Sequence, residues 1–222
     1  MKKELDKAFM KKTLIASIVA TAIWLVCFIV FIPLACKGIV PSEASRYLSC
    51  ISVLFMIWVP FAFVFLRVKF DFTVFIVYLV FIFLATLVGS GFSVYHFVSW
   101  YDTVIHFLSG VVIGFVGYTL FSQNSKERLN YVWLFIFVVA FAMLCGGMWE
   151  IYEFMGDLIT GSDMQVSAGF VGQKALMDTM IDIICDFGGG LVAAVCCIFL
   201  ERNKRKAKPV ETVEGDISQV NK

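Results

Sequence analysis

The sequence predicts an all-α protein, a polytopic bundle of about six membrane-spanning helices. Of its 222 residues, 60% are hydrophobic and 24 are Phe, and the mean hydropathy is +0.89. A water-soluble domain of this length does not need so much apolar surface, whereas helices that face lipid do. Lys and Arg concentrate in the termini and in short segments between apolar runs. Because no basic patch is expected on a folded surface, the composition argues against nucleic-acid binding.

Six apolar runs have the length of about 20 residues that a bilayer core requires. They cover residues 13–35, 48–67, 71–90, 103–122, 130–155 and 175–200. The first run follows a charged N-terminal segment and so resembles a signal peptide. However, it is long enough to span the bilayer, and no clear small-x-small cleavage site follows it. We therefore expect a retained first helix.

These runs predict a single transmembrane domain over residues 13–200. Within it, residues 13–90 are expected to form an apolar scaffold, and residues 91–200 carry the ionisable groups of the membrane interior. Residues 1–12 are expected to be a cytoplasmic segment. The polar segment 201–222 has few large apolar residues and is predicted to be a disordered cytoplasmic tail.

The distribution of Lys and Arg predicts that both termini are cytoplasmic. If the N-terminus is inside, the outer segments carry only Lys37, Arg46 and Lys174. The other Lys and Arg residues then lie on the inner segments, and the excess recurs on each of them. Because cytoplasmic segments are enriched in positive charge, we expect an N-in, C-in orientation.

The seven Cys residues form no Cys-x-x-Cys motif. Most of them lie in apolar runs and are expected to act as small apolar side chains. Cys36 and Cys50 flank one predicted outer loop, and they are the pair that an oxidising space would join.

Ionisable side chains recur in the last three spans at spacings of three or four residues. They are Asp102 and His106 in the fourth, Glu150, Glu153 and Asp157 in the last turns of the fifth, and Asp178, Asp182 and Asp186 in the outer half of the sixth. Such spacings place side chains on one helical face. With the predicted orientation, all three groups lie near the outer membrane surface. Ionisable groups are costly inside a bilayer, so we expect them to share one site.

Glycines continue these polar faces one or two turns deeper into the membrane. They are Gly110, Gly114 and Gly117 in the fourth span, Gly146 and Gly147 in the fifth, and Gly188, Gly189 and Gly190 in the sixth. Small residues allow membrane helices to approach closely. We therefore expect these three helices to pack tightly at mid-membrane and to diverge outward around an acidic cup.

The carboxylates and the imidazole of this cup predict a divalent metal site. So many carboxylates, with no Lys or Arg in the three spans that carry them, must be protonated, solvated or neutralised by a bound cation. Carboxylate oxygens with one imidazole suit Mn, Mg, Ca or Zn. The candidate metal ligands are Asp102, His106, Glu150, Asp182 and Asp186. Glu153 or Asp178 is the candidate catalytic general base.

Three functions are compatible with this pattern. The first is a divalent-metal-assisted enzyme that acts, among membrane lipids, on a lipid or lipid-linked head group. The second is a cation- or proton-coupled transporter, because carboxylate relays are common in proton paths. The third is a non-catalytic envelope-stress or assembly factor in which the acids are structural. The residues leave the choice between them, and the oligomeric state, open.

The polar stretches resemble the YjdF-like family of bacterial membrane proteins. The resembling parts are Tyr101-Asp102-x-x-x-His106-Phe107, Trp149-Glu150-x-x-Glu153 and Asp178-x-x-x-Asp182-x-x-x-Asp186. This resemblance implies a multi-pass protein of the bacterial inner membrane. The first part is also similar, more distantly, to the VanZ-like family linked to teicoplanin resistance, which implies a role in the cell envelope. Asp186 stands where that family usually has Asn.

Overall fold

The computed structural model is helical throughout, apart from short turns, over the residues that it describes. These are residues 2–35, 47, 51–59, 72–124, 130–161, 163–165 and 172–207. The elements, in chain order, are α1 (Lys2–Val26), the π-helical η1 (Cys27–Phe31), α2 (Ile32–Ala35), α4 (Phe72–Ile82), the π-helical η2 (Phe83–Gly91), α5 (Val94–Phe97), α6 (Tyr101–Asn124), α7 (Tyr131–Thr160) and α8 (Gln173–Ala207). The described residues contain no strand, which confirms the predicted all-α class.

Five helices of the described part are long and apolar enough to cross a membrane. They are Phe9–Val30, Phe72–Gly91, Tyr101–Gln123, Tyr131–Thr160 and Leu176–Lys206. Each overlaps a predicted span. The other predicted span, 48–67, is described only over residues 51–59, which are helical. The pair Cys36 and Cys50 lies outside the described residues.

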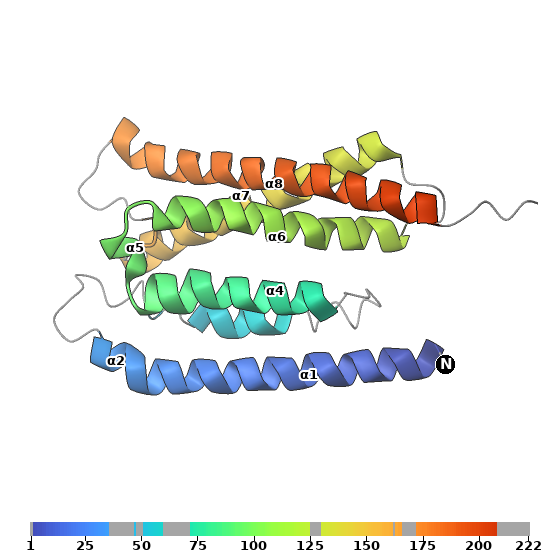
Figure 1. The fold of residues 1–222 in the computed structure, drawn as a ribbon. Coiled ribbons are helices and arrows are strands. Elements are labelled where there is room, and N and C mark those ends of the chain that lie inside the picture. Colours follow the sequence, from blue (N-terminus) through green and yellow to red (C-terminus); the bar gives the residue numbers. More distant parts are fainter. Residues whose placement is uncertain are drawn as a thin grey trace, which may run out of the picture.

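The N-terminal helices share an apolar core. α1, residues 51–59 and α4 contribute its large buried side chains, among them Trp24, Ile57 and Phe75. Figure 1 shows α4 between α1 and α6, so this layer lies directly beside the polar helices. A short turn, in which Ser93 adopts a left-handed φ of 61°, then leads through α5 into α6.

The C-terminal helices α6, α7 and α8 pack against one another along their lengths. α7 begins at Asn130, whose side chain accepts hydrogen bonds from the main-chain N–H groups of Val132 and Trp133. α7 ends at Gly161, which takes a left-handed φ of 65° as helix-ending glycines commonly do. α8 continues to Ala207, so residues 201–207, which were expected in the disordered tail, are helical. The last turn of α8 is basic, and such residues favour the C-terminal end of a helix.

Both the start of α1 and the end of α8 lie at one end of the bundle (Figure 1). The start of α6, the end of α7 and the start of α8 lie at the opposite end. The fold therefore brings the three ionisable groups of the sequence to the same depth, at the end of the bundle that faces away from the N-terminus.

Candidate functional site

Four ionisable side chains are almost completely buried at this end of the bundle. His106 on α6 is 5% exposed, Glu150 on α7 is 4%, and Asp182 and Asp186 on α8 are 4% and 1%. Lys, Glu and Asp are rarely buried to this degree without partners. We call these four residues, together with Asp102 on the first turn of α6, the acid–histidine cluster.

The imidazole of His106 is held on one side by Asp186. Its Nδ1 lies 3.0 Å from Asp186 Oδ2, which is a hydrogen-bond distance. The hydroxyl of Ser109, one turn further along α6, contacts the other carboxylate oxygen of Asp186 and lies 2.8 Å from the main-chain oxygen of His106. Asp186 therefore fixes the orientation of the ring, and Ser109 fixes Asp186.

The opposite ring nitrogen of His106 faces the remaining carboxylates. Its Nε2 lies 3.7 Å from Asp102 Oδ1 and 3.6 Å from Glu150 Oε1. One ligand atom each from Asp102, His106 and Asp182 lie within 4.8 Å of one another. The structure thus brings all five predicted metal-ligand residues into one cluster, with Asp186 on the Nδ1 side of the ring and Asp102 and Glu150 near Nε2.

Glu150 contributes an oxygen that has no hydrogen-bond partner among the described residues. This atom, Oε1, is buried on α7 and is the one that faces the His106 ring. A buried carboxylate oxygen without a partner is costly. A proton or a cation between Glu150 and His106 would satisfy it.

Glycines allow the three helices to approach closely enough to build the cluster. A side chain at Gly110 of α6 would collide with the main-chain oxygen of Asp186, and one at Gly189 of α8 with the main-chain oxygen of Phe107. A side chain at Gly146 of α7 would collide with the Asp186 carboxylate itself. The predicted close packing of these helices is therefore present. Gly147 is different, because a methyl group added there would meet no atom of the described residues within 4 Å.

The two candidate general bases lie at the rim of the cluster. Glu153 is one turn beyond Glu150 on α7, and Asp178 is one turn before Asp182 on α8; both are partly buried. At a rise of about 1.5 Å per residue, Glu153 lies about 4.5 Å from Glu150 along its helix and Asp178 about 6 Å from Asp182, each toward the end of the bundle that faces away from the N-terminus. This position is suited to exchanging protons with a group held above the buried cluster.

Asp157, further along α7, has a structural role. Its carboxylate accepts hydrogen bonds from the main-chain N–H groups of Met164, at 2.6 Å, and Gln165, at 3.1 Å. The Gln165 side chain in turn donates to Thr179 Oγ1 at 2.9 Å. Asp157 therefore ties the segment after α7 to the start of α8.

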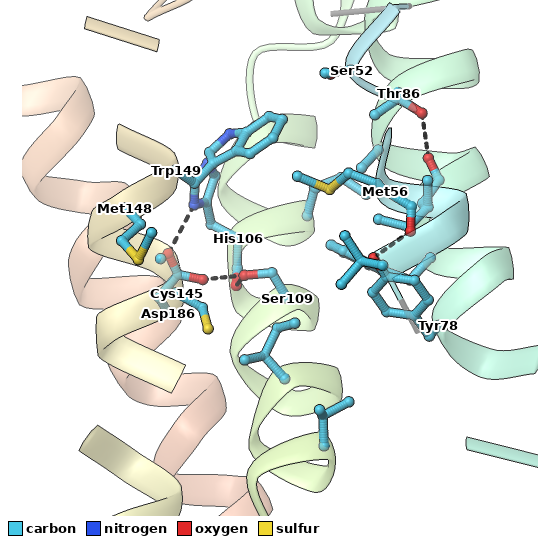
Figure 2. A pocket seen from close by; sticks show the side chains of 18 of the residues that line it. Ser52, Met56, Tyr78, Thr86, His106, Ser109, Cys145, Met148, Trp149 and Asp186 are labelled. Atoms are coloured by element: carbon cyan, nitrogen blue, oxygen red, sulfur yellow. Dashed lines mark hydrogen bonds and ion pairs between the residues drawn. The ribbon is translucent and has the colours of Figure 1, made fainter. Parts of the chain in front are cut away.

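An apolar cavity of about 480 Å³ adjoins the cluster. His106, Ser109 and Asp186 line one part of it, and Figure 2 shows these residues across the cavity from Met56 and Tyr78. The rest of the wall is mostly aliphatic and aromatic side chains from residues 51–59, α4, η2, α6 and α7. A cavity of this size is in the range of ligand-binding pockets, which are about 300–1,000 Å³.

Two residues of the site carry no assigned role in the sequence prediction. The helical spacing could have indicated Ser109, since it follows His106 by three residues on the same face of α6. Tyr95 on α5 lines the cavity and contacts the ring of Tyr101, with centroids 5.3 Å apart. Burial, reinforced by nearby carboxylates such as Asp102, raises the pKa of the Tyr95 phenol well above its ordinary value, so the hydroxyl stays a hydrogen-bond donor. No spacing rule links Tyr95 to the cluster, because it lies on a separate short helix.

The cluster can act chemically as a cation site. A neutral His106 that donates its Nδ1–H to Asp186 presents the Nε2 lone pair toward Asp102 and Glu150. A carboxylate that orients a metal-binding imidazole in this way is a common feature of metal sites. The donor set of carboxylate oxygens and one imidazole fits Mn, Mg, Ca or Zn.

Fold and site together define the class: a multi-pass helical membrane protein with a buried acid–histidine cluster. The chain belongs to the family described as "Predicted membrane protein (DUF2238)", whose model matches residues 20–203 and so includes every residue of the cluster. The YjdF-like resemblance is consistent with this family.

One curated relative aligns with part of the chain. It is named "Uncharacterized protein", comes from Thermotoga maritima and is 26% identical over 108 residues. The aligned part covers 49% of this chain and 53% of the relative, so the similarity spans about half the length of that protein. No solved structure matches the chain.

Proposed function

We propose that the acid–histidine cluster binds one divalent cation and that the protein is a metal-assisted enzyme acting on a lipid or lipid-linked head group. The observation that carries this proposal is the convergence of Asp102, His106 and Asp182, whose ligand atoms lie within 4.8 Å of one another. Glu150 is the fourth ligand, because its unpartnered oxygen faces the same side of the ring. Asp186 orients His106 instead of binding the metal directly.

The charge balance of the bundle supports a bound cation. α6 and α7 contain no Lys or Arg, and α8 has them only at Lys174 and from Arg202 onward. The single imidazole of His106 cannot neutralise four neighbouring carboxylates. The carboxylates that it leaves uncompensated are strongly destabilising in a buried site. A divalent cation removes most of this repulsion without any protein cation.

The cluster would apply its chemistry to a group at the membrane surface. A bound divalent ion polarises a phosphoryl or carbonyl oxygen and lowers the pKa of a water molecule. Glu153 and Asp178, at the rim, would accept the proton of the attacking water and return it to the leaving group. The buried part of the cluster holds the metal, and the rim moves the protons.

The setting of the cluster favours an amphiphilic substrate. The cluster lies at one end of a membrane bundle and adjoins an apolar cavity through His106 and Ser109. The predicted orientation makes this the outer face of the bacterial inner membrane. A VanZ-like similarity of the stretch around Asp102 and His106 is in line with a substrate of the cell envelope.

Transport across the bilayer is the weaker alternative. Inward of the cluster, the described residues of α6, α7 and α8 form a buried apolar layer that includes Val138, Ala193 and Cys197. A proton or cation path needs polar groups through this depth. A non-catalytic assembly factor needs no metal and turns over no lipid. An assay of metal-dependent lipid turnover therefore also separates this function from the enzyme.

The test is turnover of lipid in proteoliposomes made from a bacterial polar lipid extract. The expected result is a new lipid-derived product, detected by mass spectrometry, that appears with Mn²⁺ or Mg²⁺ and disappears with a chelator. Glu153→Gln and Asp178→Asn should bind metal and lose the product, whereas Glu201→Gln, a carboxylate variant at the far end of α8, should keep it. Metal binding without any product in the wild type would contradict the enzymatic part.

A further inference from the structure

The cavity beside the cluster has an apolar interior and a polar end. Its polar end is formed by His106, Ser109 and Asp186. From His106 to Val116, the lining residue of α6 farthest from that end, ten residues of helix span about 15 Å. The cavity therefore extends from the cluster toward the middle of the bundle.

Two of the hydroxyl groups that line the cavity already have hydrogen-bond partners. The hydroxyl of Tyr78 donates to the main-chain oxygen of Met56 at 2.9 Å, and that of Thr86 donates to the main-chain oxygen of Ile82. The remaining interior is lined by residues such as Ile113 and Phe141. A buried water needs two to four polar partners, so most of this space is unsuited to water.

The volume also favours an occupant. At about 480 Å³, the cavity is about three times as large as the apolar cavity of about 150 Å³ that accommodates benzene. Leaving apolar space empty destabilises a protein in proportion to its volume. In a bilayer, the surrounding hydrocarbon is the available apolar material.

We infer that the cavity binds one acyl chain of a membrane phospholipid inside the bundle, with the head group of that lipid at the acid–histidine cluster. The inference rests on the proposed function, because the acyl chain belongs to the amphiphile on which the cluster acts. Tyr95, a protonated donor on the cavity wall, is placed to hold the polar part of the same lipid. The substrate class is thus a phospholipid that has one acyl chain inside the bundle instead of in the bilayer.

The experiment uses phosphatidylglycerol with a diazirine in the middle of one acyl chain, incorporated with the protein into nanodiscs. After irradiation, mass spectrometry locates the crosslinks. We expect crosslinks on Ile113, Val116 and Phe141. Val116→Trp should reduce them roughly fivefold or more, because a close-packed interior leaves no room for the acyl chain beside the larger ring. The matched control is Val195→Trp on α8, where the native side chain is 45% exposed, and it should leave them unchanged.

A second filling variant, Ala85→Leu on η2, which also lines the cavity, keeps the test decisive if Val116→Trp does not fold. Crosslinks confined to outward-facing residues such as Val195, or unchanged by both filling variants, would overturn the inference. Metal content, measured on the same wild-type nanodisc sample, separates the two proposals. Crosslinks without metal binding in the wild type would support the acyl-chain site and contradict the proposal of a metal-assisted enzyme.

Discussion

His106 and Asp186 lie 80 positions apart in the sequence, and their side chains meet at 3.0 Å between Nδ1 and Oδ2. The contact crosses the α6–α8 interface, where a side chain at Gly110 would collide with the main chain of Asp186. Close helix packing and the orientation of the imidazole are therefore parts of one arrangement. Any change that separates α6 from α8 also releases the ring that faces Asp102 and Glu150.

Asp186→Asn tests the orienting role of this carboxylate. The amide keeps the size of the side chain but no longer holds the Nδ1–H of His106 with a charged acceptor. Loss of such an outer partner lowers metal affinity by about 10–100-fold in metal sites. Isothermal titration of the purified protein with Mn²⁺ or Zn²⁺ measures the change, and Glu201→Gln is the control. Unchanged affinity would show that Asp186 does not position the ring.

Gly189→Ala tests the packing of α8 on α6. The added methyl group would press on the main-chain oxygen of Phe107, and overpacking of this kind costs about 1–3 kcal/mol. We expect a lower melting temperature in detergent, followed by tryptophan fluorescence. Gly147→Ala is the matched control, because an added methyl group there meets no described atom within 4 Å, and it should melt like the wild type. Equal melting of the two variants would argue against the close approach.

Asp157→Ala separates stability from metal binding. It leaves the N–H groups of Met164 and Gln165 without their acceptor, at a cost of about 1–3 kcal/mol for a buried unpaired donor. We expect a lower melting temperature with metal affinity within about threefold of the wild type, since Asp157 stands outside the cluster. Asp157→Asn retains an acceptor and should be milder. A large loss of metal affinity in Asp157→Ala would place this residue in the site.

Metal binding should weaken as the pH falls. Metal ligands must be deprotonated, so protons compete with the cation for the imidazole and the carboxylates. The affinity for the metal ion is therefore highest at neutral pH and is lost toward acid. We expect the dissociation constant to rise about tenfold or more from about pH 7.5 to about pH 5.5 in titrations with Mn²⁺. A constant affinity over this range would exclude His106 as a ligand.

The sequence predicts the convergence of the cluster because its physical causes are local. The four-residue spacing of Asp102 and His106, and that of Asp182 and Asp186, places each pair on one face. Gly110 and Gly189 lie on the same faces and permit the contact between the two helices. The length of each apolar run then sets the common depth.

The cavity and the division of roles within the cluster depend on features that spacing does not encode. The cavity wall combines several separate stretches of the chain, and its shape depends on how α4 and the segment 51–59 tilt against α6. Which ring nitrogen of His106 meets Asp186 depends on a rotamer choice within a packed interface. Tyr95 reaches the cavity from a short helix after the turn at Ser93, so no helical periodicity indicates it.

The central claim is that the acid–histidine cluster holds a divalent cation. Elemental analysis of the detergent-purified protein, prepared without chelators, tests it most directly. We expect about one divalent ion per chain in the wild type and none above background in His106→Ala, which removes the imidazole at the centre of the cluster. A wild-type protein that contains no divalent metal, and whose melting temperature does not rise with added Mn²⁺, Zn²⁺, Mg²⁺ or Ca²⁺, would contradict the claim.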